Sequence, residues 1–171
     1  LARGLSRLLV PHPNMLSFEQ AGSLPITWST THVAFAAAHC MTHHTVLVHA
    51  AAGGVGLAAA EYTAWLGAII HGTGGQVYKH VALRADGDGV VTSCSSSRVA
   101  SAFAFGLAHW THGARLNVVL NSLASDFTSV SFALLATRGC LEESGQRSVW
   151  RAKRADARGA RVRAELLARE P

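Results

Sequence analysis

The sequence has few cysteines, little charge and no apolar run long enough to cross a membrane. Its three cysteines, Cys40, Cys94 and Cys140, are odd in number and far apart. This usage is typical of buried thiols in a reducing compartment, and the lack of a CxxC pair gives no indication of a zinc site. The apolar stretches end well short of the roughly 20 residues that span a bilayer, and no basic segment followed by an apolar one opens the chain. We therefore expect a cytoplasmic protein with no bound metal and no membrane partner.

Charged side chains make up only 15% of the 171 residues, whereas hydrophobic ones make up 49%. This balance is typical of one well-buried globular domain. Residues 1–146 carry as many basic as acidic side chains, so the whole net charge of +5 lies in residues 147–171. Because that basic tail has a single aromatic residue, Trp150, it favours a solvated linker or helix over a surface for nucleic acid.

The order of apolar and glycine-rich segments predicts strands that alternate with helices. Ser17 and Gln20 have the spacing of a capping box, so a helix is expected to begin there. Pro25 is expected to open a second, longer helical run over residues 26–40. Strands are expected over residues 45–49, 68–71, 89–92, 117–120 and 139–142, with helices over 55–66, 77–85, 100–109 and 127–135 between them. Short apolar strands alternating with helices predict an α/β, Rossmann-type fold with a doubly wound parallel sheet.

Residues 49–56 read HAAAGGVG and lie between an expected strand and an expected helix. They match the pattern G-x-G-x-x-G with Ala51 in place of the first glycine, followed by Gly53 and Gly56. Gly53 has no Cβ, so the backbone there can approach a pyrophosphate, and Gly56 lets the helix pack closely on the strand. The start of the helix offers N–H groups and a partial positive charge to the phosphates. The alternative is a tight turn without a ligand, but the strand–turn–helix context favours a dinucleotide site.

The residues after this turn favour NADPH over NADH. NAD-binding units place Asp or Glu about 20 residues after the glycines, where it binds the ribose hydroxyls. No acidic residue lies between Tyr62 and Ala85, and that region has instead a small polar turn, residues 73–76, followed by Lys79. A lysine attracts a 2′-phosphate that a carboxylate would repel, and Arg98 is a second cation after the next expected strand. The alternative is that both cations are ordinary surface charges.

Several motifs in one order give the chain a family resemblance. They are the turn at 49–56, its spacing to 73–79, the Ser96-Ser97-Arg98 triplet, the Val118-Val119-Leu120-Asn121-Ser122-Leu123 run, the upstream segment 18–30 with Leu24-Pro25 and Thr30, and the downstream segment 139–150. Together they cover about residues 11–150. The chain thereby resembles the enoyl-reductase domains of modular polyketide synthases, which are zinc-free medium-chain dehydrogenase/reductases of the quinone oxidoreductase type. The enoyl reductase of animal fatty acid synthase is a close relative of that family.

This resemblance implies NADPH-dependent reduction of an enoyl thioester bound to an acyl carrier protein, within a multidomain synthase. A hydride from the nicotinamide adds to the β-carbon and a proton to the α-carbon. The cofactor-binding positions that the resemblance implies are Ala52, Gly53, Gly54, Val55 and Gly56 at the pyrophosphate, Thr73, Gly74 and Gly75 at the adenosine ribose, Lys79 and Arg98 at the 2′-phosphate, and Asn121, Ser122, Leu123 and Thr30 at the nicotinamide end.

Two departures from the family leave the activity open. Gln146 stands where the family has a lysine that is a candidate proton donor, and an amide can hydrogen-bond an enolate oxygen but cannot protonate the enolate as an ammonium does. The family's GroES-like substrate domain is also missing, so we expect a fragment, with residues 1–24 as a connecting segment from that domain, 25–146 as the NADP-binding Rossmann domain and 147–171 as a basic tail or linker. The alternatives are a degenerate, non-catalytic nucleotide-binding module of a synthase and another zinc-free reductase of the quinone type.

Overall fold

The computed structural model describes residues 7, 9–85, 91–123, 126–144 and 161–163. Its centre is a six-stranded parallel sheet with the strand order β3-β2-β1-β4-β5-β6. The strands are β1 Thr45–Val48, β2 Ile69–Gly74, β3 Val91–Ser96, β4 Leu116–Asn121, β5 Leu135–Glu143 and β6 Arg161–Arg163, and the helices are α1 Phe18–Ala37, α2 Gly54–Leu66, α3 Val77–Ala85, α4 Ala100–Trp110 and α5 Asp126–Leu134. The predicted Rossmann-type doubly wound sheet is confirmed.

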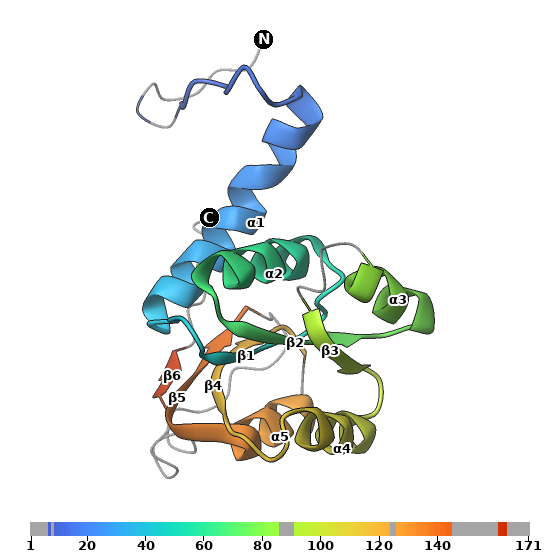
Figure 1. Ribbon diagram of the computed structural model, residues 1–171. Helices are drawn as coiled ribbons and strands as arrows, with labels where there is room; N and C mark the ends of the chain where they lie inside the picture. Colours follow the sequence, from blue (N-terminus) through green and yellow to red (C-terminus); the bar gives the residue numbers. More distant parts are fainter. Residues whose placement is uncertain (1–6, 8, 86–90, 124–125, 145–160, 164–171) are drawn as a thin grey trace.

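Helices cover both faces of this sheet (Figure 1). α1, α2 and α3 lie on one face, and α4 and α5 lie on the other. The strand order grows outward from β1 to β3 and then resumes with β4 on the opposite side of β1. This change of direction leaves a crevice at the carboxyl ends of β1 and β4, which is where ligands bind in folds of this kind.

Two helix boundaries are set by residues that the sequence singles out. The Ser17 hydroxyl accepts the N–H of Gln20, and the side-chain oxygen of Gln20 accepts the N–H of Ser17 at 2.9 Å, so the predicted capping box is confirmed. Gly67 ends α2 with a φ of 70°, a conformation that glycine adopts without the steric cost of a Cβ.

The prediction that Pro25 opens a second helix is wrong, because α1 continues through Pro25 without a break. A proline removes one backbone donor and crowds the preceding turn. Hydroxyl groups on either side also bond other carbonyls of the same helical segment. Ser23 Oγ donates to the Gln20 carbonyl at 2.8 Å, and Thr27 Oγ1 donates to the Ser23 carbonyl at 3.0 Å. One helix therefore crosses the predicted domain boundary after Leu24.

Part of the basic tail is neither the solvated linker nor the helix that its composition predicts. Arg161–Arg163 form β6, which pairs in parallel with β5 and sets Arg161 opposite Cys140. Three residues in a segment rich in Arg and Ala carry no strand pattern of their own, so the neighbouring strand decides their conformation. The rest of the tail lies outside the described residues, and so does Gln146.

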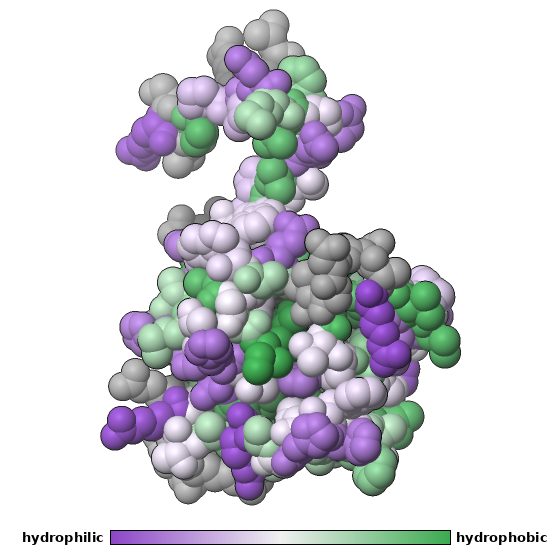
Figure 2. Space-filling model, viewed as in Figure 1, coloured by the Kyte–Doolittle hydropathy of each residue, from purple (hydrophilic) through white to green (hydrophobic). Residues whose placement is uncertain are grey.

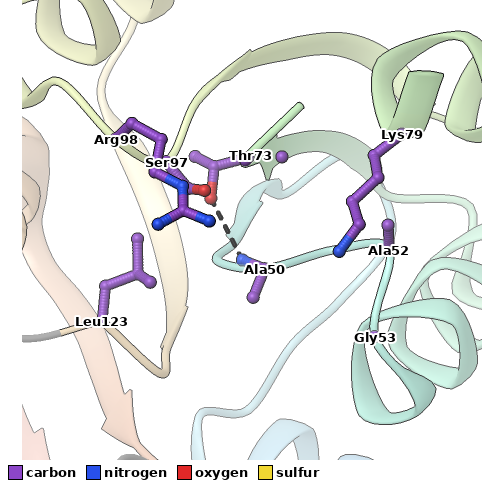
Figure 3. A pocket seen from close by; sticks show the side chains of 10 residues that line it. Ala50, Ala52, Gly53, Thr73, Lys79, Ser97, Arg98 and Leu123 are labelled. Carbon is purple, nitrogen blue, oxygen red and sulfur yellow. Dashed lines mark hydrogen bonds between the residues drawn. The ribbon is translucent and has the colours of Figure 1, made fainter. Parts of the chain in front are cut away.

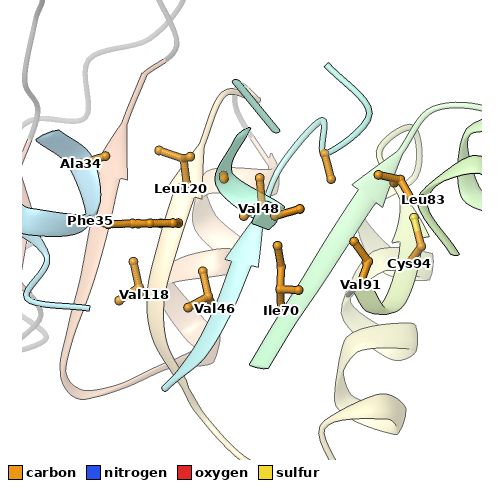
Figure 4. Packing of buried hydrophobic residues seen from close by; sticks show 13 residues of the cluster. Ala34, Phe35, Val46, Val48, Ile70, Leu83, Val91, Cys94, Val118 and Leu120 are labelled. Atoms are coloured by element: carbon orange, nitrogen blue, oxygen red, sulfur yellow. The ribbon is translucent and has the colours of Figure 1, made fainter. Parts of the chain in front are cut away.

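The two faces of the sheet pack on separate clusters of buried side chains. The cluster under α1, α2 and α3 is apolar and is built around Phe35, Val46, Ile70 and Leu120 (Figure 4). The apolar cluster under α4 and α5 contains Leu47, Phe103, Leu107, Leu116, Val119, Phe132, Leu135 and Leu141. Burial of this apolar surface is the main driving force for folding. No helix in the described parts of the chain is both long and apolar enough to cross a membrane.

Candidate functional site

A pocket of about 290 Å³ lies at the carboxyl ends of β1 and β2, next to the start of α2. The turn after β1, the end of β2, the helix α3 and the segments after β3 and β4 all contribute to its wall (Figure 3). The lining residues are Ala50, Ala52, Gly53, Thr73, Gly74, Gly75, Lys79, Ser97, Arg98 and Leu123. The fold therefore brings predicted site residues from distant parts of the sequence into one place.

The turn after β1 has an unusual backbone conformation. Ala50 has a φ of 51°, in the left-handed region that residues other than glycine rarely adopt. The Ala50 N–H donates to Thr73 Oγ1 at 3.1 Å, the Ala51 N–H donates to the Thr73 carbonyl at 2.9 Å, and the Gly53 N–H donates to the Ala50 carbonyl at 2.9 Å. Thr73 of β2 thus fixes the turn, and residues strained in this way cluster at ligand sites.

Glycine is required where α2 meets this turn. A Cβ added to Gly56 would lie 2.5 Å from both the Cα and the carbonyl oxygen of Ala51, a distance that no side chain can occupy. A Cβ on Gly53 would lie 3.3 Å from the carbonyl oxygen of Ala50, which is tight but less severe. Gly56 therefore sets the packing of the helix on the turn, and Gly53 keeps the pocket wall free of side chain.

The amino end of α2 has open N–H groups beside the pocket. Gly53 is the N-cap, no side chain caps the helix, and the first turn has no acidic residue. The first N–H groups of a helix have no partner within the helix, and the helix dipole adds a partial positive charge at this end. This end of α2 is therefore suited to an anion.

Two cations approach the pocket from opposite sides. Figure 3 shows Lys79 reaching from α3 toward Ala52, while Arg98 lies across the pocket. The lining that the structure describes contains no carboxylate. Gly75 makes room for the guanidinium group, because a Cβ there would lie 3.0 Å from Arg98 Nε and 3.4 Å from Nη2. The side chains that reach the pocket thus give it a positive charge.

A buried amide holds Leu123, the lining residue after β4. Asn121 is fully buried, its Oδ1 accepts the Leu123 N–H at 3.2 Å, and its Nδ2 donates to the Leu123 carbonyl at 2.8 Å. The same Nδ2 donates to Glu143 Oε2 at 2.6 Å. Ser122 Oγ donates to the His49 carbonyl at 3.2 Å. Asn121 and Ser122 therefore shape the loop from behind, and Leu123 reaches the pocket.

Other predicted site residues lie outside the lining of this pocket. Gly54, Val55 and Gly56 form the first turn of α2, and none of them lines the pocket. Thr30 is half-buried on α1, and its neighbour Thr31 donates to the Val55 carbonyl at 3.4 Å. Thr30 thus lies on the helix that packs against α2 and is not part of the pocket lining.

Ala50 and Ser97 line the pocket although their sequence context assigns them no binding role. Ser97 could have been suspected, because it precedes Arg98 directly after an expected strand. Ala50 gives no such signal, since alanine normally avoids a positive φ and only the surrounding contacts impose it.

The histidines, cysteines and acidic residues of the described segments do not gather into any group of three or more that could hold a metal ion. Burial raises the pKa of Cys40 and of Cys94 to about 11, so both thiols stay protonated near neutral pH. Neither thiol is therefore available as a thiolate nucleophile.

Comparison with known proteins identifies the family. No protein-family model matches the chain. A highly reducing polyketide synthase of Emericella nidulans is 38% identical over 138 residues, which are 80% of this chain and 5% of the synthase. The solved nucleotide-binding subdomain of the enoylreductase domain of PpsC from Mycobacterium tuberculosis is 30% identical, with a TM-score of 0.70, over 80% of this chain and 77% of that one. The chain belongs to the enoyl-reductase family of polyketide synthases.

Other solved structures share the fold. The CurK enoyl reductase is 31% identical with a TM-score of 0.82, over 90% of this chain and 46% of that chain. The mycobacterial protein Rv1454c, solved in complex with NADPH, is 25% identical with a TM-score of 0.76, over 89% of this chain and 47% of that chain. The predicted resemblance is confirmed. The chain spans 5% to 6% of the length of the curated relatives it matches, and it corresponds to the nucleotide-binding part of an enoyl-reductase domain.

Proposed function

We propose that the chain binds NADPH in this pocket and, as part of a larger synthase, reduces an enoyl thioester carried on an acyl carrier protein. The observation that carries the proposal is the pair of cations, Lys79 and Arg98, on either side of a pocket whose described lining has no carboxylate and which adjoins the amino end of α2. A solved relative in complex with NADPH supports the choice of cofactor.

The turn after β1 fits a pyrophosphate. Gly53 presents main chain without a Cβ to the pocket, and Ala52 beside it is small. Gly54, Val55 and Gly56 supply the first N–H groups of α2. These residues bind the two phosphates through the main chain, with help from the helix dipole, so their side chains matter chiefly by being small.

The end of β2 fits the adenosine half of the cofactor. The ribose lies against Thr73, Gly74 and Gly75, and its 2′-phosphate lies between Lys79 and Arg98. A guanidinium group binds two phosphate oxygens at once, and an ammonium group acts as a point charge on the third. NADH lacks this phosphate and gains nothing from either cation.

The segment after β4 receives the nicotinamide end of the cofactor. Leu123 offers an apolar side chain to the ring, while Asn121 and Ser122 hold the loop in place through the hydrogen bonds described above. Thr30 of α1 does not line the pocket, so its assignment to the nicotinamide end rests on the family resemblance alone. In this assignment Leu123 contacts the nicotinamide ring, while Asn121 and Ser122 position the loop that carries it.

The reaction needs a hydride at the β-carbon of the enoyl thioester, which the cofactor supplies when bound, and a proton at the α-carbon. A neutral amide such as that of Gln146 can hydrogen-bond an enolate oxygen but cannot deliver a proton as an ammonium group can. The proton therefore comes from solvent. An acyl carrier protein and the other domains of a synthase are the partners that this chemistry requires.

Gln146 also favours a second candidate function, that of a nucleotide-binding module without catalysis. General acid catalysis is typically worth about 10²–10⁴-fold in rate, so in the parent synthase Gln146→Lys should restore turnover of a surrogate enoyl thioester if a proton donor is what is missing. Equal rates in parent and variant would show that solvent suffices and would favour a working enzyme. Reduction of a quinone but not of the thioester would point to the quinone-type reductases.

A cofactor titration tests the proposal. Fluorescence titration is expected to give a Kd for NADPH at least tenfold below that for NADH, about 1.4 kcal/mol. Lys79→Ala should weaken NADPH and leave NADH nearly unchanged. Arg84→Ala removes a cation from the same helix outside the pocket and should change neither affinity. Equal affinities of the unmodified chain for the two cofactors would overturn the assignment.

We also retain the division into residues 1–24 as a connecting segment, 25–146 as the NADP-binding domain and 147–171 chiefly as a linker. Exposed apolar side chains support the first part, because Met15 before α1 is 94% exposed and Phe18 at its start is 82% exposed. Figure 2 shows apolar side chains on the surface of the projecting end of the molecule. These side chains suit packing against a preceding substrate domain in the parent protein. A cytoplasmic location stays a prediction from the sequence.

A further inference from the structure

His49 is the residue that joins β1 to the phosphate-binding turn, and it is almost completely buried at 3% exposure. Its ring lies edge-on to Phe103 of α4, with the ring centroids 5.2 Å apart, and to Phe127 of α5, at 6.0 Å. The imidazole therefore stands behind the turn, between the sheet and the two helices of that face, and does not line the pocket.

Both ring nitrogens of His49 have hydroxyl partners. Nδ1 lies 3.2 Å from Thr73 Oγ1, and Nε2 lies 2.8 Å from Ser131 Oγ on α5. The Ala50 N–H donates to the same Thr73 oxygen at 3.1 Å, and Ser131 Oγ donates to the Phe127 carbonyl at 2.7 Å. One buried chain of hydrogen bonds thus runs from the phosphate-binding turn through the imidazole to α5.

The direction of each bond in this chain is determined by its ends. The Ala50 N–H can only donate, so the Thr73 oxygen accepts from it. The Thr73 hydroxyl donates to Nδ1 of His49 because Nε2 carries the imidazole hydrogen toward Ser131, which leaves Nδ1 as an acceptor. The Phe127 carbonyl can only accept, so the Ser131 hydroxyl donates to it and accepts from the imidazole. Every group is satisfied when His49 is neutral and carries its hydrogen on Nε2, an assignment that follows from the partners.

The main chain of His49 makes hydrogen bonds to the loop on the other side of the pocket. Its N–H donates to the Leu120 carbonyl at 3.0 Å, and its carbonyl accepts the Ser122 hydroxyl at 3.2 Å. Ser122 adjoins Leu123, which lines the pocket. His49 is therefore bonded both to the turn beside β2 and to the loop after β4.

We propose that His49 is a positioning residue for the cofactor, in that its neutral imidazole orients the Thr73 hydroxyl and thereby holds Ala50 and the phosphate-binding turn in their strained conformation. The inference deepens the proposed function and rests on it. His49 makes no contact with the cofactor in this account and acts through Thr73. The Ser131 contact serves to orient the ring, so that Nδ1 faces Thr73 as an acceptor.

His71 provides a matched comparison within the same molecule. It is also 3% exposed, and its Nδ1 also lies near a hydroxyl, that of Ser93 at 2.6 Å. Ser93 is not part of the pocket lining, and within the described part of the chain it makes no hydrogen bond to the turn, whereas Thr73 lines the pocket and accepts from Ala50. Loss of either histidine should cost stability, but only His49 should affect the cofactor.

Two variants of His49 each keep one of its two ring hydrogen bonds. The Oδ1 of His49→Asn can take the place of Nδ1 and still accept from Thr73, whereas the Nε2 of His49→Gln can still donate to Ser131 but leaves Thr73 without its acceptor. His49→Gln is expected to weaken NADPH by about tenfold, the effect of one typical buried hydrogen bond, and His49→Asn by less than about twofold. Both should lower Tm to a similar degree, and His71→Gln should lower Tm without changing the Kd for NADPH.

A second readout needs no cofactor. Exchange of the Ala50 amide hydrogen, followed by NMR, should be about tenfold faster in His49→Gln than in the unmodified chain and nearly unchanged in His49→Asn, since the loosened Thr73 hydroxyl protects it less. If the unmodified chain fails to bind NADPH, the proposed function falls, while this exchange still decides the role of His49. The ¹⁵N spectrum of the unmodified chain should show the Nε2–H form of His49 from pH 5 to 8. A dominant Nδ1–H form, or binding losses that simply follow stability in both variants, would overturn the proposal.

Discussion

The two faces of the sheet are built from different kinds of side chain. The face under α1, α2 and α3 packs on an apolar cluster, with Phe35 and Ile70 each 1% exposed. The face under α4 and α5 has its own apolar cluster but also buries imidazole, hydroxyl and amide groups that are hydrogen-bonded to one another or to the main chain. These groups include His49, His71, Thr73, Ser93, Asn121, Thr128 and Ser131.

This difference assigns the two faces different tasks, one of stabilising the fold and one of holding the main chain of the site in place. Apolar packing is non-directional and scales with the buried area, whereas hydrogen bonds fix distances and angles. The first face therefore supplies mainly stability, although its cluster also contains Ala51 of the turn, with Ala52 and Val55 packed against it. The polar face holds the turn at Ala50 and the loop at Leu123, which are the parts of the main chain that must be placed accurately for a cofactor.

The largest expected effect is on the apolar face. Phe35→Ala removes a fully buried ring from the first cluster and should lower the free energy of unfolding by about 3–5 kcal/mol. In urea unfolding the matched surface variant Phe105→Ala, at a side chain that is 79% exposed, should change it by less than about 0.5 kcal/mol. The preference of the folded Phe35→Ala protein for NADPH over NADH should not change, and a reversed preference would break the separation of the two faces.

The polar face should make stability depend on pH. Burial lowers the pKa of His49 from 6.5 in the unfolded chain to about 3 in the folded one. Below pH 6.5 the unfolded chain therefore binds a proton that the folded chain does not. The stability that the neutral His49 allows is fully present above pH 6.5, and the free energy of unfolding falls as the pH drops from 6.5 toward 3. Between pH 7.5 and 5 a shift of this size amounts to about 2 kcal/mol.

Urea unfolding at several pH values measures this effect when the unmodified chain is compared with His49→Gln. Burial also lowers the pKa of His71, which acts in the same direction but is present in both proteins, so their difference isolates His49. The variant should show the shallower dependence on pH. Parallel curves for the two proteins would mean that His49 is not held neutral by the fold.

The order of strands and helices could be predicted because each segment carries its own pattern, as the run at 45–48 and the glycines of the turn show. Two features could not. Pro25 lies inside α1 although proline is most common in the first turn of a helix, and no residue around it signals this position. The strand β6 exists only through its pairing with β5.

The residues of the candidate site also fall into those that the sequence predicts and those that it does not. Lys79 and Arg98 could be predicted because the missing acidic residue and the charge of each side chain are visible in the sequence. The role of His49 could not, because its partners Thr73 and Ser131 are 24 and 82 residues away. The positive φ of Ala50 is likewise imposed by tertiary contacts and not by its own preference.

A smaller effect should come from Gly75, which makes room for Arg98. Gly75→Ala puts a Cβ 3.0 Å from Arg98 Nε, so the guanidinium group must shift away from the 2′-phosphate. NADPH should lose about fivefold more affinity than NADH does, about 1 kcal/mol, since both cofactors share the ribose that Gly75 contacts. Gly22→Ala, at a helical glycine with no atom within 4 Å of the added Cβ, is the control and should change neither Kd. An equal loss for both cofactors would show that Gly75 serves the ribose rather than the phosphate.

The smallest effect concerns the strain at Ala50. Ala50→Gly relieves a φ of 51° and should raise the free energy of unfolding by about 0.5–1 kcal/mol. Ala52→Gly, at a lining residue without a positive φ, should instead lower it slightly, because glycine gains more freedom in the unfolded chain. Thermal unfolding of the two variants measures both changes. A loss of stability in both variants would mean that the turn is not strained.

Calorimetric binding of 2′,5′-ADP and 5′-AMP tests the central claim most directly, because these ligands differ only by the 2′-phosphate. The account predicts that the unmodified chain prefers 2′,5′-ADP and that the double variant Lys79→Ala/Arg98→Ala loses about 100-fold in affinity for it, since each charge-assisted contact is worth at least about tenfold. Its affinity for 5′-AMP should stay the same. An unmodified chain that binds both ligands equally, or a double variant that keeps the preference, would contradict the assignment of Lys79 and Arg98 to the 2′-phosphate.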